Sequence, residues 1–154
     1  MRSRLPLVTC SAVFALACHH GPQGLAPVLP VQRVYYDDGP AFRDSIHLVI
    51  QDSTTWKQVW RQATSTQASP PPRPEVDFGS EILLLVGAGR MAPGDQIRVD
   101  SVGVRGDFFI AVVRITTECR PLAADVYPLE IVRTRRTGKP VAFENRREKG
   151  TNCQ

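Results

Sequence analysis

The four cysteines are the residues of this 154-residue sequence with the clearest potential for covalent chemistry. Cys10 and Cys18 lie in the first twenty residues, whereas Cys119 and Cys153 lie in the second half. In an oxidising compartment the second pair would close a loop of about 34 residues, which the chain-entropy model values at roughly 3–4 kcal/mol. We therefore predict a Cys119–Cys153 disulfide that braces the C-terminal end. Two free thiols are the alternative, and a catalytic thiol is not expected.

The segment before Cys18 has the pattern of an export signal. Arg2 and Arg4 precede an apolar stretch, Leu5 to Ala17, which is shorter than the ~20 residues that a membrane-spanning helix needs. Its last three residues, Ala-Leu-Ala, followed by cysteine resemble the lipobox of bacterial lipoproteins. We expect residues 1–17 to be removed as a signal peptide and Cys18 to be acylated. A plain secretory signal, cleaved at the same bond, is the alternative.

A glycine-rich stretch, GAGRMAPGD, occupies residues 87–95 and could bind phosphate in another context. A phosphate cradle requires the glycines to follow a strand and to lead directly into a helix, whose N-terminus faces the anion. Here the glycines lead into the alternating residues 96–105, and no Lys-Ser or Lys-Thr follows them. We therefore predict a turn between two strands.

Residues for hydrolytic chemistry are few. His19 and His20 fall in a Gly/Pro-rich segment, and His47 sits at an alternating strand position that is typical of a surface or half-buried side chain. No ligand set with zinc-like or calcium-like spacing is present, so neither a metal nor a cofactor is expected. An envelope enzyme with a carboxylate site stays open as an alternative, with Asp95, Asp100 and Glu118 as its candidate residues.

The charge balance argues against nucleic acid as a partner. Loss of Arg2 and Arg4 with the signal would leave 17 basic against 15 acidic residues, a net charge near +2. The basic run Arg133, Arg135, Arg136 and Lys139 lies at the end of a predicted strand, where such a run is typical of a solvated face that blocks edge pairing. Binding of an acidic protein surface or of anionic lipid is the alternative for this run.

The periodicity predicts an α+β fold, in which a mostly antiparallel sheet carries one amphipathic helix on a face. Asp52 or Ser53 can cap the helix, in which apolar residues recur at three- and four-residue spacing: Trp56, Val59, Trp60 and Ala63. Strands are expected at 31–36, 45–51, 81–88, 96–105, 108–116, 126–134 and 140–143, the last two as a pair around the turn RRTGKP. Residues 18–30 are expected to be a flexible tether, and residues 31–154 a single domain.

The order of these motifs resembles the C-terminal domain of the protease-complex subunit PrcB family. In that family an Asp-Phe pair precedes an apolar strand, as Asp77-Phe78 does here, and a glycine loop with a proline leads into the next strand. A terminal Pro-Val-x-Phe follows a basic turn, as at 140–143. The resemblance covers about residues 50–145. It implies a small α+β domain, secreted or lipid-anchored, that assists a protease complex without cutting bonds itself.

These observations together predict an exported, lipid-anchored, non-catalytic domain that holds or stabilises a protein partner, such as a protease, at the bacterial cell envelope. It would face the periplasm or the cell surface, with its N-terminal lipid in the membrane. The loop 87–95 is the candidate binding site, through Gly87, Gly89, Arg90, Met91, Gly94 and Asp95. A protease inhibitor that inserts the same loop into an active site is the alternative.

Overall fold

The computed structural model describes residues 24–119, 124–151 and 153. The predicted signal peptide 1–17 and the predicted lipidation site Cys18 lie outside these residues. The described elements are β1 (Val28–Leu29), β2 (Gln32–Asp37), β3 (Ser45–Ile50), α1 (Ser53–Ala63), β4 (Glu81–Ala88), β5 (Gln96–Arg105), β6 (Phe108–Thr117), β7 (Leu129–Arg135) and β8 (Val141–Lys149).

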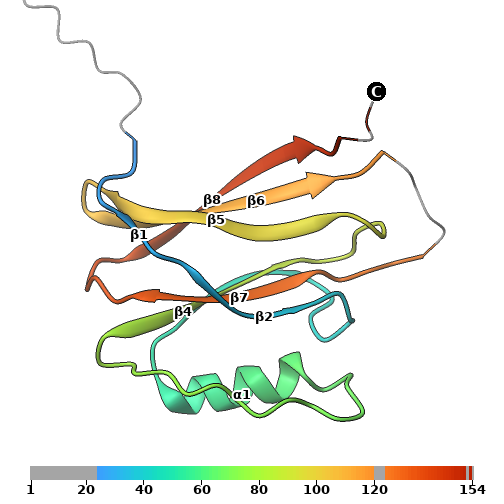
Figure 1. Ribbon diagram of the computed structural model, residues 1–154, viewed down its shortest axis with the longest axis horizontal. Coiled ribbons are helices and arrows are strands. Elements are labelled where there is room, and N and C mark those ends of the chain that lie inside the picture. Colours follow the sequence, from blue (N-terminus) through green and yellow to red (C-terminus); the bar gives the residue numbers. More distant parts are fainter. Residues whose placement is uncertain (1–23, 120–123, 152, 154) are drawn as a thin grey trace, which may run out of the picture.

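The strands form two four-stranded sheets rather than one. The first has the order β1-β5-β6-β8 and the second the order β2-β7-β4-β3. All neighbours are antiparallel except β6 and β8, which are parallel. Figure 1 shows the first sheet above the second and α1 beneath the second, so that the layers run sheet, sheet, helix. The predicted α+β class, with mostly antiparallel strands and one helix on a face, is confirmed.

The helix forms where the sequence predicted it, because capping and amphipathicity agree. Asp52 is the N-cap, and its Oδ1 accepts a hydrogen bond of 2.8 Å from the Thr55 N–H. The four predicted apolar residues of α1 are its buried ones. The indole N–H groups of Trp56 and Trp60 donate to the carbonyls of Pro74 and Pro71 in the proline-rich segment that follows. Both tryptophans therefore belong to the core and not to a ligand platform.

The apolar run of β4 is explained by its central position between the two cores. Ile82, Leu84 and Val86 face the first sheet, where they pack with residues of β5 and β6. Leu83 and Leu85 face α1 and pack with its tryptophans. A strand buried on both faces needs apolar residues at every position, which is why the run is continuous rather than alternating.

Two further sequence-based expectations differ from the structure. The strands 126–134 and 140–143 were expected to pair, but β7 pairs with β2 and β4, and β8 pairs with β6. The predicted pairing of 126–134 with 140–143 was wrong because the inward-facing Val141 and Phe143 pack in the core between the sheets, next to β6. In the predicted tether 18–30, Val28–Leu29 form β1 on β5, and the Ala26 N–H donates to the Val104 carbonyl.

Candidate functional site

The glycine-rich stretch begins inside a strand and only then becomes a loop. Gly87 is part of β4, where it lies opposite Ile46 and Leu129. A Cβ at this position would lie 2.9 Å from Cγ2 of Ile46, so the close packing of β3 explains the glycine. Gly87 is therefore a packing residue, and the candidate loop proper starts after Ala88.

Gly89 and Gly94 supply the turn conformations that the sequence predicted. Their φ angles are 75° and 96°, values that side-chain-bearing residues rarely adopt. Between them, Met91 exchanges two backbone hydrogen bonds with Val126, of 2.9 and 3.0 Å. The loop is thus fixed at both ends and in its middle, which gives a partner a preformed surface.

The Asp95 carboxylate accepts hydrogen bonds from two backbone N–H groups at the loop. Its Oδ2 accepts a hydrogen bond from the Ala92 N–H at 3.1 Å, and its Oδ1 accepts one from the Glu118 N–H at 2.7 Å. The residue is buried. The carboxylate therefore ties the loop to the end of β6, and we assign Asp95 a structural role in the site rather than a contact with a partner.

An open cavity of about 520 Å³ lies beside this loop. The loop contributes one wall, and the ends of β3, β4, β6 and β8 contribute the others. The lining residues are Ser45, Ala88, Arg90, Met91, Ala92, Asp95, Ile115, Thr117, Ala124, Asp125, Asn145 and Arg147. Three of the six predicted loop residues, Arg90, Met91 and Asp95, thus meet at one site.

The opposite wall of the cavity was not predicted from the sequence. Asn145 and Arg147 come from the polar second half of β8, which has no apolar alternation and was not expected to be a strand. Only the parallel pairing of β8 with β6 brings them to the loop. The isolated pairing of Val126 with Met91 similarly places the segment that contains Asp125 at the cavity.

The lining of the cavity combines a few apolar residues with more numerous polar and charged ones. Ala88, Met91 and Ile115 are buried or half-buried, whereas the side chains of Arg90 and Arg147 are exposed. A guanidinium nitrogen of Arg90 lies 3.6 Å from the Asp125 carboxylate, and both side chains remain solvated. Such a pair contributes little to stability and can exchange its partner easily. Exposed guanidinium groups at such a site can bind a carboxylate through charge-assisted hydrogen bonds.

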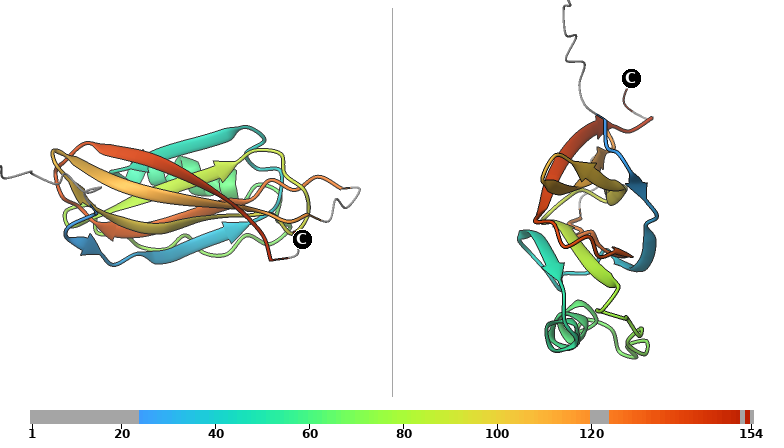
Figure 2. Two further views of the ribbon diagram at one scale, coloured as in Figure 1. Left: turned by 90° about the horizontal axis from the view of Figure 1, so that it is seen from above. Right: turned by 90° about the vertical axis from the view of Figure 1, so that its left-hand side faces the viewer.

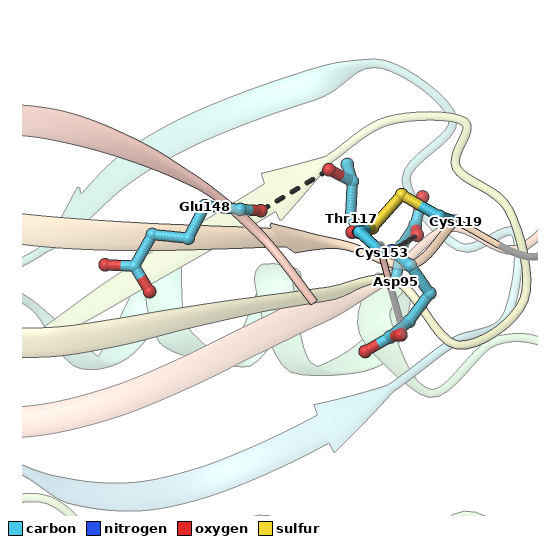
Figure 3. The surroundings of a disulfide bond; sticks show 6 residues. Asp95, Thr117, Cys119, Glu148 and Cys153 are labelled. Carbon is cyan, nitrogen blue, oxygen red and sulfur yellow. Dashed lines mark hydrogen bonds between the residues drawn. A yellow bond between two sulfur atoms is a disulfide. The ribbon is translucent and has the colours of Figure 1, made fainter. Parts of the chain in front are cut away.

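The predicted disulfide is present between Cys119 and Cys153. Figure 3 shows it beyond the end of β6, close to Thr117 and Asp95. The Gly150 N–H donates to the Thr117 carbonyl at 2.8 Å, and the Thr117 hydroxyl donates to the Glu148 carbonyl at 3.4 Å. The covalent link and these bonds therefore hold the C-terminal ends of β6 and β8 together at the edge of the cavity.

Two of the three candidate carboxylate residues of an enzyme, Asp95 and Glu118, are neighbours at the end of β6, where the Glu118 N–H donates to Asp95 Oδ1. Asp100 pairs with Arg114 on the same sheet. The Glu118 carboxylate lies over Gly150, where a Cβ would contact it. Asp95 is engaged with backbone donors, as described above. Among the described residues, no group of three or more His, Cys, Asp and Glu side chains is placed to hold a metal ion.

The basic run at the end of β7 makes contacts with neighbouring strands and turns. Arg133 bonds to Gln32 and lies 3.9 Å from the Glu81 carboxylate, and Arg136 donates to the Phe78 carbonyl and to Gln51. These contacts tie strands and turns of the second sheet together. The run is therefore better explained by the packing of its own sheet than by an acidic ligand.

Comparisons of the chain with protein-family models, with curated proteins and with solved structures found no match. The resemblance to the PrcB family stays a prediction. Within residues 24–119, 124–151 and 153, no helix is long and apolar enough to cross a membrane.

Proposed function

We propose that this chain is an exported, non-catalytic binding domain that is anchored to the cell envelope by lipid at Cys18 and holds a protein partner in the cavity beside loop 87–95. The observation that carries the proposal is the cavity itself, which places Arg90 and Met91 of the loop opposite Asn145 and Arg147 of β8. An envelope protease is the first partner to test, on the strength of the PrcB resemblance.

Several features of the chain support this proposal. The disulfide is of the kind that persists in oxidising compartments outside the cytoplasm. The turn conformations, the Met91–Val126 bridge and the Asp95 hydrogen bonds pre-order the loop, so that binding costs little conformational entropy there. An open, mixed cavity on a rigid sandwich is more typical of a binding module than of a closed active site.

The test is a crosslinked pull-down of the full chain with a C-terminal affinity tag from envelope fractions. The proposal predicts one protein recovered in a fixed ratio to the chain, and a loss of that protein with Arg90→Glu. Lys57→Glu is the matched control, because Lys57 is an exposed cation on α1, at the far side of the second sheet. Equal recovery with both variants, or no protein above background, would overturn the proposal.

The activity of a recovered protease separates a helper from an inhibitor. A helper raises or preserves activity when the chain is added, whereas an inhibitor that inserts loop 87–95 lowers it. Turnover by the chain alone, abolished by Ala at Asp95, Asp100 or Glu118 without loss of folding, would instead favour the carboxylate enzyme.

A further inference from the structure

β8 is the outer strand of the first sheet and leaves one of its edges without a partner among the described residues. Within the described part of the chain it pairs with β6 alone, along Val141–Lys149. The right-hand view of Figure 2 shows β8, in red, at the margin of the first sheet, with β3, in teal, below it. At about 3.3 Å per residue a nine-residue strand offers an edge of roughly 30 Å. An unpaired edge of this length is a template for a further strand.

Two hydrogen bonds show which backbone groups of β8 are available. The Pro140 carbonyl accepts from the Phe109 N–H, and the Gly150 N–H donates to the Thr117 carbonyl. Because groups alternate in direction along a strand, the even-numbered residues of β8 point their N–H and C=O groups toward β6. The odd-numbered residues, Val141, Phe143, Asn145, Arg147 and Lys149, point theirs outward.

The charges of β8 are complementary to the same strand running the other way. If two copies pair antiparallel about Asn145, the numbers of residues that face each other have a constant sum. Glu144 of one copy then lies opposite Arg146 of the other, and the two-fold axis produces this pair two times. The remaining opposite pairs join Val141 with Lys149, Ala142 with Glu148, and Phe143 with Arg147. In this register no two like charges are opposite each other.

The neighbouring antiparallel registers lack this property. A two-fold axis through residue 144 places Glu144 opposite itself, and an axis through residue 146 places Arg146 opposite itself and Glu144 opposite Glu148. Like charges directly opposite each other destabilise a strand pair. Charge therefore selects the register centred on Asn145, which is also the register in which the outward-pointing groups of Asn145 can bond to those of the second Asn145.

We propose that the chain forms a two-fold symmetric dimer in which the β8 strands of two copies pair antiparallel about Asn145. This pairing joins the first sheet of one copy to the first sheet of the other, so that they form one eight-stranded sheet. Such an isologous contact is closed, because the β8 edge of each copy is used once, by the β8 edge of the other. The charged residues 144 and 146–149, of which Glu144 is half-buried beside Arg105 and the others are exposed, keep the edge from pairing with unrelated strands, while they favour this one. This dimer does not depend on the binding role of the cavity.

The test is sedimentation equilibrium of the full chain in density-matched detergent, which reports the protein mass whether or not Cys18 carries lipid. The proposal predicts a concentration-dependent monomer–dimer equilibrium. Arg146→Glu puts two carboxylates opposite each other at two positions, and Glu144→Arg does the same with two guanidinium groups. Each variant should weaken the association at least tenfold, and the charge swap Glu144→Arg with Arg146→Glu should restore it, because opposite charges again face each other.

A fourth variant separates dimerisation from folding. Asn145→Pro removes an N–H that points outward, so the hydrogen bonds between β8 and β6 are untouched and the far-UV circular dichroism should stay that of the parent. It should nevertheless be monomeric. A parent that is monomeric at every concentration, a dimer unchanged by Asn145→Pro, or a charge swap that stays monomeric would each overturn the proposal.

Discussion

The His47 ring on β3 stacks on the Phe143 ring on β8, with ring centroids 4.7 Å apart and an interplanar angle of 10°. These two strands are edges of different sheets, so the stack joins the two layers at one side of the molecule. Burial lowers the pKa of His47 below its ordinary value, although a hydrogen bond with the Asn145 side chain acts in the opposite direction. The neutral imidazole is therefore the form that fits this contact.

Acidification should destabilise the fold through His47. A histidine whose pKa is lower in the folded state binds more protons when unfolded, so stability is fully present above the unfolded pKa of about 6.5 and is lost as the pH falls toward the folded pKa. His47→Phe keeps an aromatic ring but cannot titrate. Urea unfolding at pH 7.5 and pH 5 should show that the free energy of unfolding falls more between these two pH values for the parent than for this variant. Equal losses would show that His47 does not carry the effect.

Reduction of the disulfide should lower the free energy of unfolding. The Cys119–Cys153 bond spans 34 residues of sequence, and a loop of that size is worth about 3–4 kcal/mol. Urea unfolding with and without a reducing agent measures this loss. The double variant Cys119→Ala, Cys153→Ala should have the stability of the reduced parent, both with and without the reducing agent. A parent whose stability does not change with the reducing agent would contradict the prediction.

The turn after β4 should tolerate no side chain at Gly89. Gly89→Ala adds a Cβ about 3.0 Å from the Ser45 nitrogen in addition to the positive φ of 75°. Gly106→Ala is the matched control, because Gly106 has a φ of 58° with nothing within 4 Å of the added Cβ. The control should lose about 1–2 kcal/mol from backbone conformation alone, and Gly89→Ala clearly more. Equal losses in thermal unfolding would remove the steric part of this explanation.

Substitution of Asp95 should lower the free energy of unfolding, because its carboxylate has a structural role. Asp95→Ala leaves the N–H groups of Ala92 and Glu118 without their acceptor, which costs about 2–4 kcal/mol. Asp95→Asn keeps one acceptor oxygen and should lose roughly half as much. Denaturant unfolding checks both values. Parent-like stability of Asp95→Ala would show that the carboxylate does not brace the loop.

The parts of the fold that the sequence predicted are those in which local and tertiary preferences agree. Asp52 caps a helix whose apolar spacing matches the face that it buries, and the unbroken apolar run of β4 matches burial on both sides. The partner of β8 was not predictable in this way. The basic turn before it favours a local hairpin with β7, whereas the actual pairing with β6 is decided by the core that receives Phe143.

The candidate site was half predictable for the same reason. The glycines and the proline of loop 87–95 predict a turn from their residue types alone, and Gly89 and Gly94 indeed have positive φ angles. Arg147 and Asn145 carry no local signal, because they line the cavity only through a parallel strand pairing that spans the sheet. Asp95 was found by position, but its two backbone hydrogen bonds, which decide its role, depend on the end of β6.

The most direct test of the binding role is a photoreactive amino acid introduced at position 90 of the full chain and irradiated in cells. Arg90 is exposed at the rim of the cavity, so a partner in the cavity should give one discrete adduct. The same amino acid at position 57, on the exposed face of α1, should give none. An adduct from position 90 alone would support a partner held at loop 87–95, whereas no adduct at 90, or the same adduct from both positions, would contradict it.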